Sequence, residues 1–373
     1  MAENVTSNPP RHLGYLDAAR GLAAIMVMVY HFINFKYLNT TTAKVAATIF
    51  NGSDAVSLFF VLSGFVLSYK YVVLDQPLDI KRFYVTRFFR LWPAFFVTIV
   101  LNAINTNRAN LDLHTLVDIF IKNKTSFWEE AILIRNRVNY YGAGWTLNLE
   151  LALSFFIPFW VVLAKKHTKV ICWMLVAYLL IGNNMRDLFM FHFHFGLGVL
   201  ISCLFNSINS LSFKETKWYK YRFLLLLVAF LLFSIRHIDR IWPLPGKYQY
   251  LAGYFGIDFF HYTAVASFVF IVAIIQSPKA QSILEHGILR FFGKISFGIY
   301  LMHWAAVVDV FDYWEQANRF FGHRSIALLA LFVVYTAITF GLATILHYAV
   351  ELPFISLGKR IATKLKPSYN FNG

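Results

Sequence analysis

The chain has little charge and almost no cysteine. Only 14% of its 373 residues are charged, and its two cysteines, Cys172 and Cys203, lie in apolar runs without the CxxC spacing of redox or zinc motifs. No HExxH motif or Cys–His cluster occurs, and the two-residue spacing of His192 and His194 splays their side chains apart on a helix. We therefore expect no disulfide and no metal site.

Long hydrophobic runs fill most of the sequence. Hydrophobic residues make up 58% of the chain, with 40 Phe, 20 Tyr and 9 Trp, which is more than one soluble core can bury. Several runs reach the roughly 18 to 20 apolar residues that cross a bilayer core about 30 Å thick. The runs lie at about Leu16–Tyr37, Asp54–Val73, Leu91–Thr106, Thr146–Ala164, Val170–Gly182, Leu188–Phe205, Arg222–Ser234, Leu251–Ile275, Ile295–Val310 and Ile326–Val350. They predict an all-α polytopic membrane protein, a bundle of about ten transmembrane helices in one membrane domain.

Basic residues dominate the charge, but they occur in short clusters between the hydrophobic runs. The formal net charge is +15, and most clusters fall in alternate connections, as the positive-inside rule requires for cytoplasmic loops. The connections Asn107–Gly144 and Ile238–Tyr250 are exceptions, because they also hold basic residues. This pattern predicts both termini in the cytosol, with residues 1–12 and 358–373 as cytoplasmic tails and residues 13–357 as the membrane domain. It gives no reason to expect a nucleic-acid partner.

Two ionisable residues interrupt the first hydrophobic run. Arg20 and His31 are eleven residues apart, which at about 100° per residue returns them to nearly the same helix face, about 16 Å apart along the axis. With a cytoplasmic N-terminus, Arg20 lies near the cytosol, where it suits an anion, and His31 lies in the outer half, where it suits proton transfer or nucleophilic catalysis. The alternative is an arginine that snorkels beside Asp17 and a histidine that hydrogen-bonds between helices.

Glu150 is the acidic residue that depth counting brings to the level of His31. It follows Trp145 by five residues and lies roughly 8 Å below the outer interface, so we expect it to pair with His31 and to raise the basicity of the imidazole. The alternative is a structural carboxylate bonded to its own helix. His303 is expected to join the same cavity, with a packing or a substrate-contact role. Glu351, at the cytoplasmic end of the last run, is either an arginine partner or a catalytic group.

Two further stretches suit a cofactor that has a long arm and phosphates. The Ser63-Gly64 pair, at mid-membrane, allows the close approach of a thin pantetheine-like arm or, alternatively, of another helix. Arg82, Arg87 and Arg90 lie together at the cytoplasmic face and suit the phosphates of a nucleotide donor, although positive-inside anchoring explains the same charges.

Several of these motifs occur in a fixed order along the chain. The blocks are Leu16–Ala24 with His31, Leu58–Phe65, Arg87–Pro93, Trp145–Leu147 with Glu150, Ser296–His303 and Glu351–Pro353. Together they resemble the acyltransferase 3 family of membrane O-acyltransferases over nearly the whole chain. Ser57 is a departure, because the family often has Asp at this position. No hydrolase-like domain follows the last run, as it does in fused members, so we expect the membrane domain to complete the transfer alone.

The resemblance implies a multi-pass enzyme of the bacterial inner membrane. Such an enzyme moves an acyl group, commonly acetyl, from cytosolic acyl-CoA to a hydroxyl of a surface carbohydrate or its lipid-linked precursor outside the cytosol. By position, Arg20 and His31 match the family's paired functional residues, and Glu150 matches the acid of its Trp-led motif. Arg87 and Arg90 match the family's basic cytoplasmic pair.

These assignments lead to one mechanism and one alternative function. CoA binds at the cytoplasmic mouth with its arm passing Ser63, and the thioester reaches His31, which acts as a general base or as a transient acyl carrier. Trp145 and His303 are assigned to the acceptor substrate. The alternative is a transporter or flippase for a lipid-linked sugar or a small anion, in which the intramembrane charges form a substrate or proton pathway.

Overall fold

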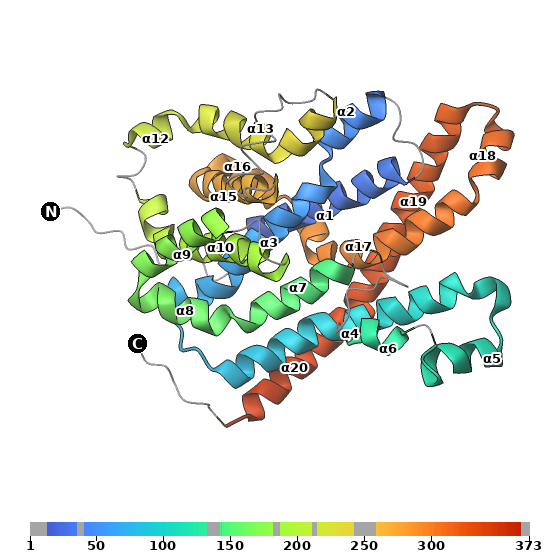
Figure 1. Ribbon diagram of the computed structural model, residues 1–373, viewed down its shortest axis with the longest axis horizontal. Coiled ribbons are helices and arrows are strands. Elements are labelled where there is room, and N and C mark those ends of the chain that lie inside the picture. Colours follow the sequence, from blue (N-terminus) through green and yellow to red (C-terminus); the bar gives the residue numbers. More distant parts are fainter. Residues whose placement is uncertain are drawn as a thin grey trace.

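The computed structural model describes residues 13–35, 41–124, 126–132, 142, 144–181, 187–210, 215–241 and 259–366, and within them every regular element is a helix (Figure 1). The long helices are α1 (Gly14–Asn34), α3 (Gly52–Val72), α4 (Ile80–Thr106), α10 (Asp187–Asn209), α13 (Arg222–Ile241), α15 (Phe259–Gln276), α17 (Gly287–Asp312) and α19 (Arg324–Leu346). The shorter ones are α2 (Thr41–Ile49), η1 (Arg108–Asn110), α5 (Leu113–Leu116), η2 (Val117–Ile121), α6 (Phe127–Ala131), α7 (Gly144–Phe155), α8 (Ile157–Lys166), α9 (Thr168–Ile181), α12 (Lys217–Lys220), α16 (Pro278–Leu284), α18 (Trp314–Phe321), η4 (His347–Glu351) and α20 (Leu352–Lys364). Residues 1–12 and 367–373 of the predicted tails, and residues 242–250 of a predicted loop, lie outside the described residues.

In the described part of the chain, six helical segments are long and apolar enough to cross a membrane. The number rises to eight if α7 with α8, bent by 46°, and α15 with α16, bent by 96°, each count as one span. Pro158 and Pro278 lie in the first turn of the second helix of each pair. A proline has no backbone N–H, so it cannot continue the preceding helix, but it fits the first turn of a new one. All ten predicted runs overlap helices, but length and composition support six to eight spans, and α9 and α13 add only shorter apolar stretches.

The start of α1 and the end of α20 lie at the same end of the bundle, which we call the terminal end. Tyr15, in the first turn of α1, belongs to the same buried cluster as Tyr69, in the last turn of α3. A short segment leads from α3 to α4, where Arg82 Nη2 donates to the carbonyl oxygen of Leu365 at 3.1 Å. The first and the last residues of the described chain therefore lie on one side of the bundle.

Close backbone contacts at glycines fix how the central helices pack. A side chain at Gly21 on α1 would meet the backbone nitrogen of Gly293 on α17 at 2.6 Å, so these two helices touch backbone to backbone. A side chain at Gly64 on α3 would collide with the backbone of Phe195 on α10. Gly64 thus serves helix packing, which is the alternative that the sequence left open for it. Arg20 precedes Gly21 and Lys294 follows Gly293, so the contact between α1 and α17 brings these two basic residues close together.

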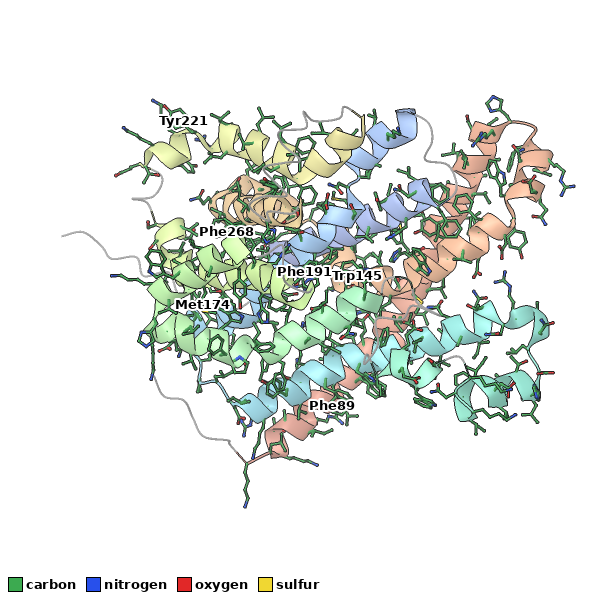
Figure 2. All side chains as sticks on the ribbon, in the orientation of Figure 1. Phe89, Trp145, Met174, Phe191, Tyr221 and Phe268 are labelled. Atoms are coloured by element: carbon green, nitrogen blue, oxygen red, sulfur yellow. The ribbon has the colours of Figure 1, made fainter. Side chains whose placement is uncertain are left out.

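Large apolar side chains also cover the outside of the bundle, as Figure 2 shows. Trp173, Phe223 and Leu329 are 73%, 71% and 63% exposed. Apolar surface of this extent is unusual on a soluble monomer and is what lipid contact requires. The chain therefore has the surface of a multi-pass membrane protein.

Candidate active site

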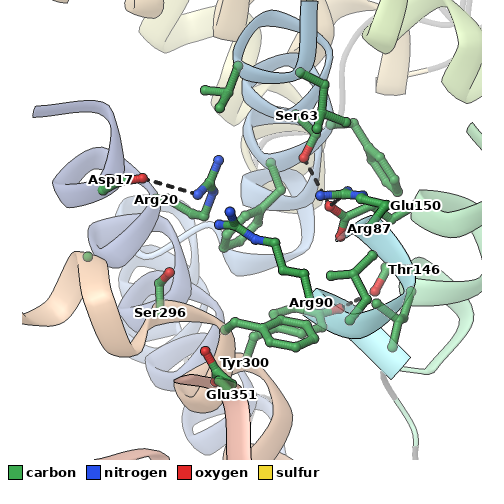
Figure 3. Close-up of a pocket in the computed structure, with 18 of the residues that line it drawn as sticks. Asp17, Arg20, Ser63, Arg87, Arg90, Thr146, Glu150, Ser296, Tyr300 and Glu351 are labelled. Atoms are coloured by element: carbon green, nitrogen blue, oxygen red, sulfur yellow. Dashed lines mark hydrogen bonds and ion pairs between the residues drawn. The ribbon is translucent and has the colours of Figure 1, made fainter. Parts of the chain in front are cut away.

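A cavity of about 240 Å³ lies between α1, α3, α4, α7, α17 and the segment formed by η4 and α20 (Figure 3). Its charged lining residues are Asp17, Arg20, Arg87, Arg90, Glu150, Lys294 and Glu351. Hydroxyl groups reach it from Ser63, Thr146, Ser296 and Tyr300. Five of the predicted site residues meet at this cavity: Arg20, Ser63, Arg87, Arg90 and Glu150.

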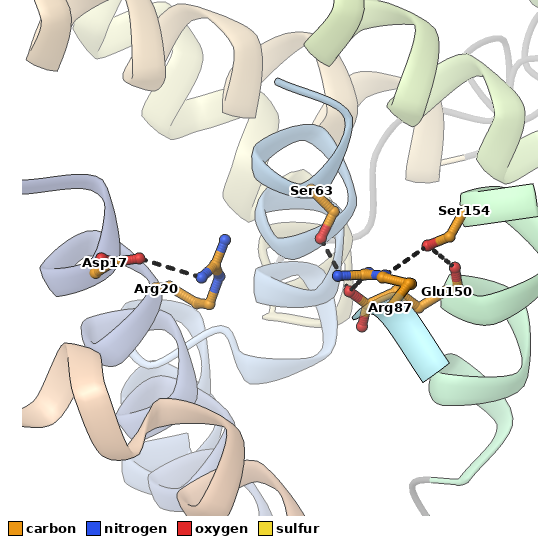
Figure 4. A network of polar contacts seen from close by, with 6 residues as sticks. All are labelled: Asp17, Arg20, Ser63, Arg87, Glu150 and Ser154. Carbon is orange, nitrogen blue, oxygen red and sulfur yellow. Dashed lines mark hydrogen bonds and ion pairs between the residues drawn. The ribbon is translucent and has the colours of Figure 1, made fainter. Parts of the chain in front are cut away.

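Arg87 is held by two side chains of α7, and a third side chain, from α3, bonds to its carboxylate partner. Its Nη2 donates to Glu150 Oε1 at 2.5 Å and its Nε donates to Ser154 Oγ at 3.0 Å (Figure 4). Ser63 Oγ donates to the same carboxylate oxygen at 3.1 Å. Because only 10% of the Arg87 side chain is exposed, the ion pair with Glu150 is weakly screened and ties α4 to α7.

The cavity holds more positive charge than its own carboxylates neutralise. Arg20 Nη1 bonds to Asp17 Oδ1 at 3.3 Å, one turn earlier on α1. Arg90 and Lys294 form no hydrogen bond or ion pair with any residue that the structure describes. Figure 3 shows the guanidinium groups of Arg20 and Arg90 pointing toward one another across the cavity. Cations that meet in this way suit an anionic ligand, and guanidinium groups suit phosphate in particular.

A second acidic group lies on the wall that η4 forms. Glu351 Oε2 lies 3.0 Å from Nδ1 of His347, and both residues are buried and line the cavity. Both belong to η4, a short π-helical turn, and such turns are rare and frequent at functional sites. The sequence allows an arginine partner or a catalytic role for Glu351, whereas its partner in the structure is a histidine. His347 and Glu351 are four residues apart, a spacing that places two side chains side by side on a helix, and this pattern could have identified His347 from the sequence.

His31 lies beyond the cavity along α1 and pairs with a second histidine. Its Nδ1 is 3.0 Å from the carbonyl oxygen of Val27 and 3.1 Å from Nε2 of His303 on α17. Nδ1 of His303 is in turn 2.7 Å from the carbonyl oxygen of Tyr300. The ring of Trp304 meets the His31 ring edge-on, with centroids 5.2 Å apart. The fold thus joins two predicted site residues that are 272 positions apart in the sequence.

The expected pair of Glu150 with His31 is wrong, because the Glu150 carboxylate bonds to Arg87 instead. Depth counting gives the height of a residue along its helix but not the direction of its side chain, and α7 presents Glu150 to α3 and α4. Trp145 is not among the residues that line the cavity. It packs beside Phe191 on α10, with ring centroids 5.9 Å apart (Figure 2).

Tyr300 connects the cavity to the histidine pair, and the sequence alone did not single it out. Its hydroxyl lines the cavity and lies 2.6 Å from Thr146 Oγ1. Its ring centroid is 5.6 Å from that of His303, and its carbonyl oxygen accepts from the same histidine. The three-residue spacing of Tyr300 and His303 on one helix is the pattern that could have identified it.

The two histidines of α10 have separate surroundings. His194 Nε2 lies 3.1 Å from the hydroxyl of Ser57, the residue that stands where the family often has Asp. His192 stacks on Tyr178, with ring centroids 6.0 Å apart. No group of three or more possible metal ligands occurs among the residues that the structure describes.

Within the described residues, an all-helical bundle with six to eight candidate spans carries a cationic cavity and a pair of imidazoles, of which that of His303 is fully buried. Cations hold an anionic group, and an imidazole can move a proton or carry a group. This combination is the arrangement expected of a membrane-embedded transferase.

The comparison with known proteins names the family. The family model described as an acyltransferase domain (acyltransferase 3) matches residues 13–348, and the chain belongs to this family, as its motifs predict. A candidate O-acetyltransferase of Staphylococcus aureus (strain COL) is 24% identical over 96% of this chain and 60% of its own length. The peptidoglycan O-acetyltransferase OatA of Listeria monocytogenes is 36% identical over 24% of this chain and 13% of its own length. The chain thus spans about 60% of the length of the curated S. aureus relative. No solved structure matches it.

Proposed function

We propose that this chain is a membrane O-acetyltransferase of the bacterial inner membrane. It moves an acetyl group from cytosolic acetyl-CoA to a hydroxyl of a carbohydrate outside the cytosol. The observation that carries the proposal is the spacing along α1, where Arg20 lines the cationic cavity and His31, in its histidine pair, lies about 16 Å further on. An anion site and a reactive imidazole at this spacing suit a donor with phosphates at one end and a thioester at the other.

The donor places its phosphates among the cavity's cations. Arg90 and Lys294 have no partner among the described residues, and Arg20 has only a 3.3 Å contact with Asp17, so all three are available to phosphate oxygens. The pantetheine arm then runs from the cavity past Tyr300 toward His31. Its amide and hydroxyl groups meet the hydroxyls that line the cavity, which keeps a polar chain hydrogen-bonded inside the bundle.

The distribution of charge supports a cytosolic position for the terminal end. Exposed basic residues at this end include Lys81, Lys166, Lys169, Lys359, Arg360 and Lys364. At the opposite end, three of the described basic residues are matched by acids, and the first of them, Arg108, pairs with Asp309 and Asp312. Lys122 and Lys124 there share Asp118. An excess of basic residues marks the cytosolic side of a membrane protein, so we place both ends of the described chain in the cytosol.

His31 acts either on the acceptor or on the donor. As a general base, an imidazole nitrogen takes the proton of the acceptor hydroxyl while the hydroxyl oxygen bonds to the thioester carbonyl carbon. The carbon–sulfur bond breaks, and the proton passes from the imidazole to the CoA thiolate. As a carrier, the nitrogen bonds to the carbonyl carbon while the carbon–sulfur bond breaks and CoA leaves as the thiolate. In a second step the acceptor oxygen bonds to the same carbon, the nitrogen–carbon bond breaks, and the proton of the acceptor hydroxyl neutralises the thiolate. Both routes end in an acetyl ester and free CoA.

A carbohydrate acceptor is supported by the name of one relative. The Listeria monocytogenes protein is a peptidoglycan O-acetyltransferase, and peptidoglycan carries sugar hydroxyl groups. We assign the final transfer to the histidine pair, because its imidazole groups can move a proton or carry an acyl group.

Acetyl transfer by the purified full-length chain in lipid nanodiscs tests the proposal. Labelled acetyl-CoA is supplied with oligosaccharide fragments of peptidoglycan, and the label is followed into the glycan by mass spectrometry. The wild-type chain and a His192→Phe control should transfer the label, because His192 lies in an aromatic cluster outside the cavity. His31→Gln should not. Surface glycan that is acetylated equally with and without the gene would refute the assignment.

The transporter alternative predicts a different result in the same preparation. In proteoliposomes, a transporter moves a lipid-linked sugar or a small anion without acetyl-CoA, and no acetyl group appears on the sugar. Transport without transfer would replace the proposed function. Transfer that stops in His31→Gln while the glycan is still exported would exclude transport as the primary role.

A further inference from the structure

The hydrogen bonds of the histidine pair determine where its protons lie. A backbone carbonyl oxygen can only accept a hydrogen bond, so a ring nitrogen that bonds to one must carry a proton. Nδ1 of His303 lies 2.7 Å from the carbonyl oxygen of Tyr300, and Nδ1 of His31 lies 3.0 Å from that of Val27. Both rings therefore carry their proton on Nδ1 when they are neutral.

The contact between the two rings agrees with this assignment. Nε2 of a neutral His303 has a free lone pair, because its proton is on the other nitrogen. That lone pair lies 3.1 Å from Nδ1 of His31, which has a proton to donate. The Nδ1 proton of His31 is thus shared between the carbonyl oxygen of Val27 and Nε2 of His303. Two independent carbonyl groups, on α1 and on α17, lead to the same pattern, and no other placement of the protons satisfies all three contacts.

We infer that His303 is a positioning residue that keeps the proton of His31 on Nδ1 and leaves Nε2 of His31 as the reacting atom. The proton placement follows from the geometry alone, and its catalytic consequence rests on the proposed function. In the general-base route, Nε2 takes the hydroxyl proton and later returns it to the CoA thiolate. In the carrier route, the same lone pair bonds to the carbonyl carbon. His303 thus has the role that the sequence predicted for Glu150, which is to pair with His31.

His303 can also stabilise the charge that forms during transfer. When Nε2 of His31 takes a proton, the ring becomes positive and its bond from Nδ1 to His303 becomes charge-assisted, which makes it stronger. A carboxylate would stabilise this charge more, but it would bring a permanent negative charge into an apolar site. The neutral imidazole avoids that cost. The packing of α1 against α17, fixed by the contact of Gly21 with Gly293, sets the distance between the rings.

Nitrogen NMR of the intact chain in lipid nanodiscs tests the proton placement directly. Histidine labelled with ¹⁵N distinguishes protonated from unprotonated ring nitrogens, and the resonances missing from His31→Gln identify His31. We expect a proton on Nδ1 and none on Nε2 of His31 in the wild-type chain. In His303→Ala we expect an added minor form with the proton on Nε2, because Nδ1 has lost one of its two acceptors and keeps the carbonyl oxygen of Val27. A proton on Nε2 of His31 in the wild-type chain overturns the inference. This measurement needs no acetyl transfer, so it stands even if the proposed function fails.

Kinetics then test the consequence for catalysis. Removing the orienting group in His303→Ala should lower kcat by about 10²-fold while the KM for acetyl-CoA stays within about twofold. His303→Gln places an amide oxygen near the position of Nε2, where it can accept from Nδ1 of His31, so it should keep kcat within about tenfold of wild type. His192→Phe is the matched control for the loss of a buried histidine and should behave as wild type. Equal losses in His303→Ala and His303→Gln, or a loss confined to KM, would contradict a positioning role.

Discussion

The two ends of the polar path along α1 differ in charge. At the Arg20 end, four cationic and three acidic side chains line one cavity. At the His31 end, the ring contacts His303, Trp304, Tyr30 and a backbone carbonyl, none of which carries a permanent charge. Under the proposed function this difference separates two tasks: the charges would bind the donor at one end, and the uncharged groups would serve the bond-making step at the other.

Distance makes this separation useful. His31 becomes positive when it takes a proton, and a nearby arginine would oppose that change. The interaction of two charges falls with distance, and about 16 Å along the helix reduces it to a quarter of its value at about 4 Å, before any screening. The same spacing leaves room for the arm of the donor. Variants at the two ends should therefore affect different kinetic constants.

The largest effect is expected at the histidine end. His31→Gln keeps a side chain of similar length but has no basic nitrogen, so kcat should fall by about 10²- to 10⁴-fold. Binding of acetyl-CoA, measured by calorimetry in nanodiscs, should stay within about twofold, because the phosphates bind elsewhere. A parallel loss of binding would show that the two ends are not separate.

The next effect is on stability and comes from the ion pair of the cavity. Glu150→Ala leaves Arg87, with 10% of its side chain exposed, without its carboxylate partner. An unpaired buried charge of this kind costs about 3 kcal/mol, so thermal unfolding should begin at a clearly lower temperature. Glu285→Ala, which removes an exposed glutamate, is the control and should unfold as wild type. An unchanged unfolding temperature in Glu150→Ala would mean that water already screens the pair.

A smaller effect should separate donor binding from chemistry. Arg90→Gln and Lys294→Gln each remove one cation that has no partner among the described residues. Each should raise the KM for acetyl-CoA about tenfold and leave kcat nearly unchanged, since one charge-assisted hydrogen bond contributes about 1.5 kcal/mol. Lys359→Gln, at an exposed site on α20, controls for the loss of a basic residue at the same end. A fall in kcat with constant KM would place these cations in the chemical step.

The smallest effect is expected at the border between the two regions. Tyr300→Phe removes the hydroxyl that lies 2.6 Å from Thr146 Oγ1 but keeps the ring and the carbonyl group that orients His303. The ratio kcat/KM should fall by about two- to tenfold, the usual range for one neutral hydrogen bond. A loss as large as that of His31→Gln would instead assign the Tyr300 hydroxyl to the reaction.

The sequence by itself determined the class of fold and the arrangement of the polar residues along α1. Hydrophobic runs of membrane length recur along the chain, and the helical repeat of the first run places Arg20 and His31 on one face. Both properties depend on residues that are close together in the chain. Its motifs also identify the acyltransferase family, as the family match confirms. Of the three predicted arginines on α4, Arg87 and Arg90 line the same cavity as Arg20, because depth from a helix end is a local quantity. Arg82 instead bonds to the carbonyl oxygen of Leu365.

Only the tertiary structure decided which side chains meet. Glu150 and His303 were both candidates for the neighbourhood of His31, and their depths do not distinguish them. The direction in which each side chain points depends on which helices pack together, and that depends on contacts such as Gly21 with Gly293, between residues far apart in the sequence. The packing of α1 on α17 selects His303, and the orientation of α7 in the bundle turns Glu150 toward Arg87 on α4.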